Sequence, residues 1–120
     1  IGVNDLARGE PVAAVVERYA AVVDALRARA PRAHLHCQSV LPVREGQAPA
    51  ALTNARIRAL NEGIARVAAE RSCTYVDLFS PLAGPDGALD PRFTLDGLHL
   101  TGAGYAAWAQ AIAPWTNAPR

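Results

Sequence analysis

The chain has 120 residues, of which 51% are hydrophobic and 19% are charged, and its formal net charge is +1. This length suits one domain with its own core, and this composition excludes a disordered segment. A net charge so close to zero provides no broad basic surface, so nucleic acid is not expected as a partner.

The first two predicted elements are the end of a strand and a long helix. Residues Ile1 to Leu6 have the pattern of a strand end. An amphipathic helix is predicted next, because apolar residues recur at spacings of three and four from Val12 to Leu26. Pro11 suits the first turn of this helix, and Pro31 marks the point where it stops.

Two further strands and two further helices are predicted along the rest of the chain. Residues 34–43 form a short, largely apolar run, which predicts a buried strand that ends near Leu41. Residues 52–70 have apolar positions on one helical face, and residues 72–78 have the β-branched and aromatic content of another strand. A loop rich in Pro and Gly follows, and Thr101 can cap a last helix. We expect one side of this helix to carry Tyr105, Trp108, Ala109 and Ile112.

Strands that alternate with helices of this length predict a parallel sheet of the α/β class, covered by helices on both faces. A doubly wound sheet usually has about five strands, more than this chain supplies. We therefore expect residues 1–120 to be the C-terminal portion of a single domain whose earlier strands lie outside this sequence.

The cysteines and the paired histidines have simple structural interpretations. Cys37 and Cys73 lie far apart in apolar, strand-like runs, which predicts buried free thiols rather than a disulfide. His34 and His36 share one face of a predicted strand and could begin a zinc site. We favour a structural role for them, because no other ligand motif completes the set. No metal or organic cofactor is predicted.

Polar residues at the carboxyl ends of the strands are the candidates for chemistry, since sites form at that edge of a parallel sheet. Asn4 and Asp5 follow the first predicted strand, Ser39 lies near the end of the second, and Asp96 and His99 lie in the loop after the third. A carboxylate three residues before an imidazole can reach its Nδ1 across a turn, which leaves Nε2 free as a base. The side-chain N–H of Asn4 could stabilise a developing oxyanion.

Four segments of the chain resemble sequence blocks of the SGNH hydrolases, also called GDSL-type esterases. Gly2-Val3-Asn4-Asp5 is similar to their Gly-x-Asn-Asp block, and Asp96-Gly97-Leu98-His99-Leu100, followed by Gly104-Tyr105, is similar to their last block. Gln38-Ser39-Val40-Leu41-Pro42 and Tyr75-Val76-Asp77-Leu78 resemble their later strands.

This resemblance implies a three-layer α/β/α flavodoxin-like fold and a carboxylic ester hydrolase that works through a serine acyl-enzyme. It implies that Asn4 is an oxyanion-hole donor, that His99 is the general base and acid, and that Asp96 orients His99. The serine nucleophile of the family belongs to an N-terminal Gly-Asp-Ser block, which is absent here. The serines of this chain are Ser39, Ser72 and Ser80, and none lies in such a block or in a Gly-x-Ser-x-Gly elbow. We therefore expect the chain alone to be inactive.

The Gln-Ser-Val-Leu-Pro and Asp-Gly-Leu-His-Leu segments are most similar to those of bacterial carbohydrate O-acetylesterases and of acylhydrolases of the platelet-activating-factor type. The resemblance thus implies an acetyl ester on a sugar as the substrate, with a lysophospholipid or another short acyl ester as the alternative. A second alternative is a non-catalytic module, a truncated or degenerate copy that keeps only the fold. No apolar run reaches the roughly 18 residues that a membrane span requires.

Overall fold

The computed structural model describes residues 1–116. Its elements follow in the order α1 (Val3–Ala7), α2 (Val12–Arg29), β1 (His36–Gln38), α3 (Asn54–Glu70), β2 (Thr74–Val76), α4 (Phe79–Leu82), the 3-10 helix η1 (Pro91–Phe93) and α5 (Gly102–Thr116). The strands β1 and β2 pair in parallel, with Cys37 opposite Tyr75, and α3 connects them as a βαβ unit. The prediction of an α/β fold with a parallel sheet is therefore confirmed.

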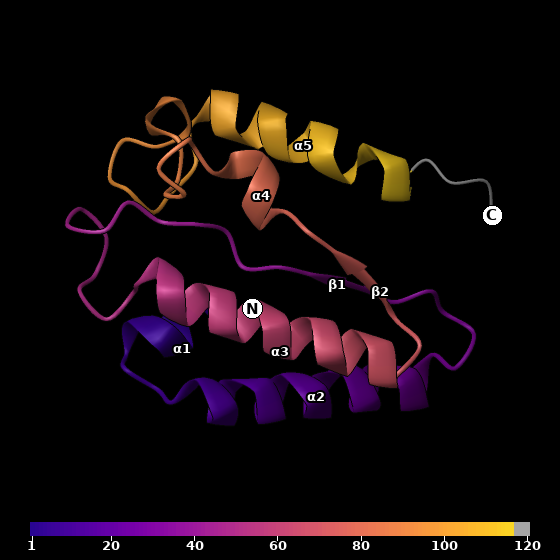
Figure 1. The fold of residues 1–120 in the computed structure, drawn as a ribbon. Coiled ribbons are helices and arrows are strands. Elements are labelled where there is room, and N and C mark those ends of the chain that lie inside the picture. Colours follow the sequence, from indigo (N-terminus) through magenta and orange to yellow (C-terminus); the bar gives the residue numbers. More distant parts are fainter. Residues whose placement is uncertain (117–120) are drawn as a thin grey trace.

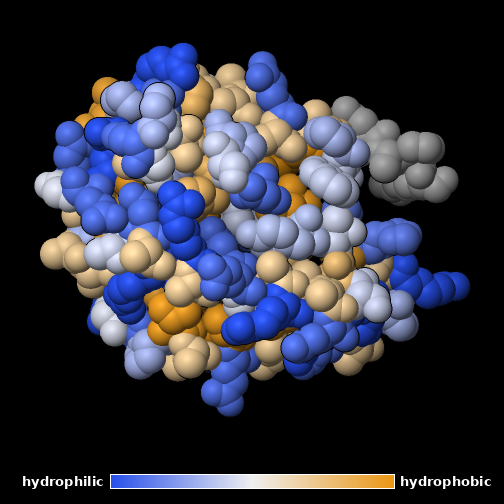
Figure 2. Space-filling model, viewed as in Figure 1, coloured by the Kyte–Doolittle hydropathy of each residue, from blue (hydrophilic) through white to orange (hydrophobic). Residues whose placement is uncertain are grey.

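Helices lie on both sides of this two-stranded sheet (Figure 1). On one side α3 packs against both strands, and α2 packs against α3. On the other side α4 and α5 lie together, so the described residues form an α/β/α arrangement. Hydrophilic residues cover much of the face in Figure 2, and hydrophobic residues show only in patches between them, because most apolar side chains turn inward.

The core lies between α3, the sheet and α2. Ile57, Leu60 and Ile64 recur along one face of α3 and are completely buried, as their spacing predicts. Cys37 of β1 is buried in the same cluster, and Cys73 packs against it partly exposed; both thiols are free. The strands are shorter than predicted, because only three residues of each strand pair with the other.

The prediction of a strand end at residues 1–6 is wrong, because Val3–Ala7 forms the short helix α1. The Leu6 N–H donates to the Gly2 carbonyl at 3.0 Å, which is a helical hydrogen bond. Val3, Leu6 and Ala7 all pack on the core, and their spacing of three and four residues is that of one helical face. A helix of five residues has too few apolar positions for its sequence pattern to be distinguished from the end of a strand.

The last helix, α5, begins as predicted, but the residues on its inward face differ from those predicted. Thr101 Oγ1 accepts a hydrogen bond from the Gly104 N–H at 3.3 Å and so caps α5. Trp108 and Ile112 are half-buried, as expected. Tyr105, which is 61% exposed, and Ala109, which is also exposed, do not belong to the inward face. The backbone of Gly104 takes the inward position instead, because a Cβ there would lie 2.7 Å from the Phe93 carbonyl oxygen. Among residues 1–116, no helix is long and apolar enough to cross a lipid bilayer.

Candidate active site

The turn before α5 brings together the two residues of the predicted acid–base pair. His99 Nδ1 lies 2.6 Å from Asp96 Oδ2. The other carboxylate oxygen, Asp96 Oδ1, accepts the backbone N–H groups of Leu98 and His99 at 2.9 and 2.8 Å. The imidazole side chain is 79% exposed, so its opposite edge is open to an incoming molecule. This is the geometry in which a carboxylate orients an imidazole through Nδ1.

These contacts hold the carboxylate of Asp96 in its charged form. The pKa of Asp96 lies well below its ordinary value, first because the His99 side chain bonds to the carboxylate, and then because two backbone N–H groups do. An ionised Asp96 can only accept hydrogen bonds, so it requires the proton of the neutral imidazole to lie on Nδ1. Nε2 of His99 is then the nitrogen that can accept a proton.

Thr94 and Gly97 shape the turn that carries this pair. The buried hydroxyl of Thr94 accepts the Gly97 N–H at 2.9 Å. Gly97 has a φ of 80°, a left-handed conformation that non-glycine residues seldom adopt. Thr94 was not predicted as a site residue, although threonine hydroxyls in loops commonly bond to nearby backbone N–H groups.

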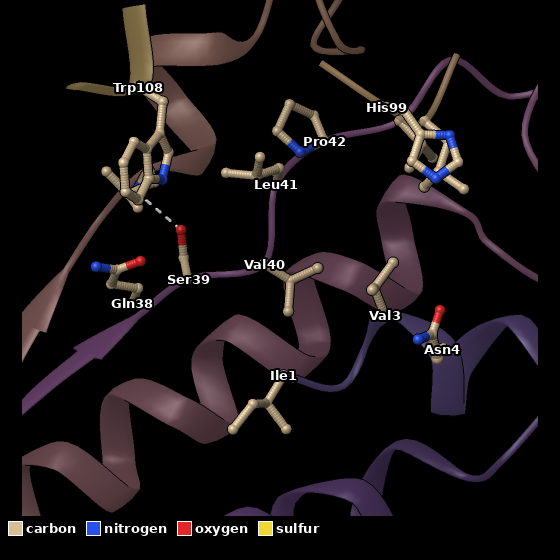
Figure 3. Close-up of a pocket in the computed structure, with 13 residues that line it drawn as sticks. Ile1, Val3, Asn4, Gln38, Ser39, Val40, Leu41, Pro42, His99 and Trp108 are labelled. Atoms are coloured by element: carbon tan, nitrogen blue, oxygen red, sulfur yellow. Dashed lines mark hydrogen bonds between the residues drawn. The ribbon is translucent and has the colours of Figure 1, made fainter. Parts of the chain in front are cut away.

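Asn4 and His99 line the same cavity, which has a volume of about 310 Å³. Figure 3 shows them at one end of it, Asn4 from α1 and His99 from the turn before α5, with Gln38 and Trp108 at the other end. Most of the remaining wall is apolar and comes from the segment after β1 and from neighbouring loops. The structure thus brings Asn4 and His99 to one cavity and places Asp96 in contact with His99.

Ser39 also lines this cavity, but its hydroxyl is used to hold the backbone. Its Oγ accepts the Leu78 N–H at 2.8 Å (Figure 3) and the Phe79 N–H at 2.9 Å. The residue is only 6% exposed. Ser72 and Ser80 line two other hollows of the surface. Within residues 1–116, no other serine lines the cavity that contains His99.

The remaining polar candidates have structural roles. Asp77 Oδ1 accepts the N–H groups of Phe79 and Ser80, at 2.9 and 3.2 Å, and so caps the start of α4. Asp5 forms an ion pair with Arg8 at 3.0 Å. His34 and His36 are exposed, and no group of three or more His, Cys, Asp or Glu side chains able to hold a metal occurs in the described part of the chain.

A carboxylate–imidazole pair beside a cavity of an α/β fold is an arrangement typical of hydrolases. Comparison with known proteins identifies the family. The sequence profile of the GDSL-like lipase/acylhydrolase family matches residues 1–107. The chain therefore belongs to this family, as the four sequence blocks predicted. No curated protein sequence matches the chain.

Three solved structures show the same arrangement of elements. A Streptococcus pneumonia protein described as a platelet activating factor is 28% identical, with a TM-score of 0.90 over 96% of this chain and 56% of its own. A GDSL-like lipase from Bacteroides thetaiotaomicron is 26% identical, with a TM-score of 0.80 over 95% of this chain and 58% of its own. A Bacteroides fragilis protein described as an acylhydrolase shares the fold at 24% identity and a TM-score of 0.79, over 95% of this chain and 57% of its own. The chain thus spans less than two thirds of each of these structures.

Proposed function

We propose that this chain carries the base, the orienting acid and one oxyanion donor of a serine ester hydrolase. The observation that supports this most strongly is the 2.6 Å contact between Asp96 Oδ2 and His99 Nδ1 beside an open cavity. An imidazole held in this way is a general base for a hydroxyl nucleophile. Membership of the GDSL-like family supports the same reaction class.

In the proposed reaction, His99 Nε2 removes the proton of a serine hydroxyl while the serine oxygen attacks the ester carbonyl carbon. The carbonyl oxygen becomes an oxyanion, which the Asn4 side-chain N–H stabilises. His99 then gives its proton to the leaving alcohol, and an acyl-serine remains. Water releases the acyl group as a carboxylic acid through the same two proton transfers, and Asp96 keeps the imidazole oriented throughout.

We place the serine nucleophile outside these 120 residues. The buried Ser39 hydroxyl already accepts two backbone hydrogen bonds, so it is a poor candidate for attack on an ester. The chain also spans only 56–58% of the similar structures from three bacteria. An imidazole without a nearby hydroxyl has nothing to activate, so the chain alone is expected not to form an acyl-enzyme.

For the substrate we propose a short acyl ester, with an O-acetyl group on a carbohydrate as the first candidate. The cavity of about 310 Å³ is at the small end of ligand pockets. Its walls include Leu98 and Trp108, which suit an acyl methyl group or the apolar face of a sugar, and Gln38 offers an amide to a hydroxyl. A phospholipid-type acyl ester is the second candidate, since one similar structure is described as a platelet activating factor.

The experiment compares this chain with a longer version that includes the residues encoded upstream. Both proteins are treated with a fluorophosphonate probe, which labels activated serines, and assayed with p-nitrophenyl acetate. We expect labelling and hydrolysis only in the longer protein, and loss of both in its His99→Ala variant. A longer protein that is folded but not labelled would instead support the non-catalytic module.

Two further outcomes test the finer parts of the proposal. If the 120-residue chain alone hydrolysed the ester and His99→Ala abolished this activity, the placement of the nucleophile outside the chain would be wrong. Comparing kcat/KM of the longer protein for an acetylated sugar, a long-chain p-nitrophenyl ester and a lysophospholipid tests the substrate class. A preference for the lysophospholipid would overturn the acetyl-sugar proposal and leave the ester hydrolase proposal standing.

A further inference from the structure

Arg44 connects the segment after β1 to the loop that carries Asp96 and His99. Its backbone N–H donates to the Gly97 carbonyl at 2.9 Å. Its guanidinium group donates to the Leu89 carbonyl at 2.9 Å and lies 3.3 Å from Asp86 Oδ2. One residue therefore contacts this loop at three separate positions.

The contact with Gly97 reaches the centre of the turn between the two residues of the acid–base pair. The Gly97 N–H is held by Thr94, and its carbonyl is held by Arg44, so this residue is fixed on both sides. The fit is also close: a Cβ on Gly97 would lie 2.7 Å from Gln47 Cβ and 3.0 Å from the Arg44 carbonyl oxygen. A displacement of Arg44 would therefore move the turn that brings Asp96 to His99.

The segment that contains Arg44 is itself anchored to α3. The Val43 N–H donates to Asn54 Oδ1 at 3.0 Å, and Asn54 Nδ2 donates to the Val43 carbonyl at 2.9 Å. The Asn54 N–H donates to Glu45 Oε1 at 2.7 Å. Because α3 contributes more buried core residues than any other element among residues 1–116, these bonds give Arg44 a rigid support.

We propose that Arg44 is a positioning residue, which acts through Gly97 to hold Asp96 and His99 in contact. This proposal rests on the proposed role of Asp96 and His99 in ester hydrolysis. It assigns Arg44 no contact with the reacting atoms. The guanidinium group is needed because it reaches the Leu89 carbonyl and the Asp86 carboxylate together. A lysine ammonium lacks this forked geometry and can replace only part of it.

The test uses the 120-residue chain and two NMR measurements that do not depend on activity. The first is the exchange rate of the Gly97 and Arg44 backbone N–H groups, compared with N–H groups in the core of α3. The second is the titration of the Asp96 carboxyl carbon. The variants are Arg44→Ala and Arg44→Lys. The matched control is Arg58→Ala, which removes a guanidinium bond to the Gly87 carbonyl in the same loop without any link to Gly97.

Arg44→Ala keeps the backbone bond to the Gly97 carbonyl but removes the guanidinium contacts with the Leu89 carbonyl and the Asp86 carboxylate. Because these contacts hold Arg44 in place, we expect exchange at Gly97 and at residue 44 to rise about tenfold, the scale of one lost hydrogen bond from a charged group, while exchange in α3 is unchanged. The pKa of Asp96 should rise towards its ordinary value as its contact with His99 loosens. In Arg44→Lys, both the exchange rates and the pKa of Asp96 should lie between those of Arg44→Ala and those of the parent chain. Unchanged values in Arg44→Ala, or equal changes in Arg58→Ala or throughout α3, would overturn the proposal. Failure of the proposed function would appear only in the esterase assay, and these readouts would not change.

Discussion

Asp96 Oδ2 meets His99 Nδ1 at 2.6 Å, while Asp96 Oδ1 bonds to the backbone N–H of the same histidine at 2.8 Å. One carboxylate therefore fixes both the ring and the backbone of His99. A short turn is sufficient for this, because the two residues are only three positions apart.

On the proposed function, Asp96→Asn should lower kcat of the longer protein by about 10⁴, the effect of the corresponding change in serine proteases. The amide cannot hold the imidazole in the tautomer that leaves Nε2 free, although the side chain keeps its shape. Steady-state kinetics with p-nitrophenyl acetate measures this effect. Asp24→Asn, which changes an exposed carboxylate beside Arg71, is the control. A loss of less than tenfold would contradict an orienting role for Asp96.

Asn4→Ala should lower kcat about 10²–10³-fold and leave KM nearly unchanged, because an oxyanion donor acts mainly in the transition state. The Asn4 side chain is exposed at the cavity, so the fold should not change. The same assay in the longer protein measures the effect, with Arg8→Gln at the end of α1 as the control. If kcat stayed the same, Asn4 would be only a lining residue.

Gly97→Ala should destabilise the chain by about 1–3 kcal/mol, since alanine at positive φ is strained and its Cβ would meet Gln47 and Arg44. The matched control is Gly102→Ala in the first turn of α5, where a Cβ meets nothing within 4 Å. That change should be neutral or stabilising by up to about 1 kcal/mol. Urea unfolding of the 120-residue chain measures both, and equal stability of the two variants would contradict the described turn.

Ser39→Ala should lower the free energy of unfolding by about 1–3 kcal/mol, because it leaves the buried Leu78 N–H without its acceptor. Ser80→Ala, at an exposed position, should have almost no effect. Urea unfolding again provides the measurement. A stable Ser39→Ala variant of the longer protein that no longer reacts with the fluorophosphonate probe would show that Ser39, and not an upstream serine, is the nucleophile.

Acid should destabilise the chain partly through Asp90. This residue is 7% exposed, and its bonds to Arg92 lower its pKa to about 2. The folded pKa lies below the unfolded value of about 3.9, so the stabilisation is present above that pH and is lost as pH falls towards 2. Thermal melts measured from roughly pH 6 to pH 2 cover both the folded and the unfolded pKa of Asp90. Over this range, Tm should fall less in Asp90→Asn than in the parent chain. Glu17→Gln, on the exposed face of α2, should follow the parent chain.

Features that depend on neighbours along the chain can be predicted from the amino-acid sequence. The apolar spacing of α3, the Thr101 cap of α5 and the Asp96–His99 pair all involve residues three or four positions apart, which a single turn brings together. The same local pattern was missed in α1, because a five-residue helix has too few apolar positions to be distinguished from a strand.

Which distant residues meet depends on how the segments of the chain pack against one another. Whether Asn4 shares a cavity with His99, whether Ser39 serves the backbone and whether Arg44 supports Gly97 depend on packing between segments more than 35 residues apart. No periodicity encodes such contacts, since each depends on how α3 and the loops at the sheet edge fill the available volume. The sequence thus determined the chemical groups of the site, and packing decided which of them face one another.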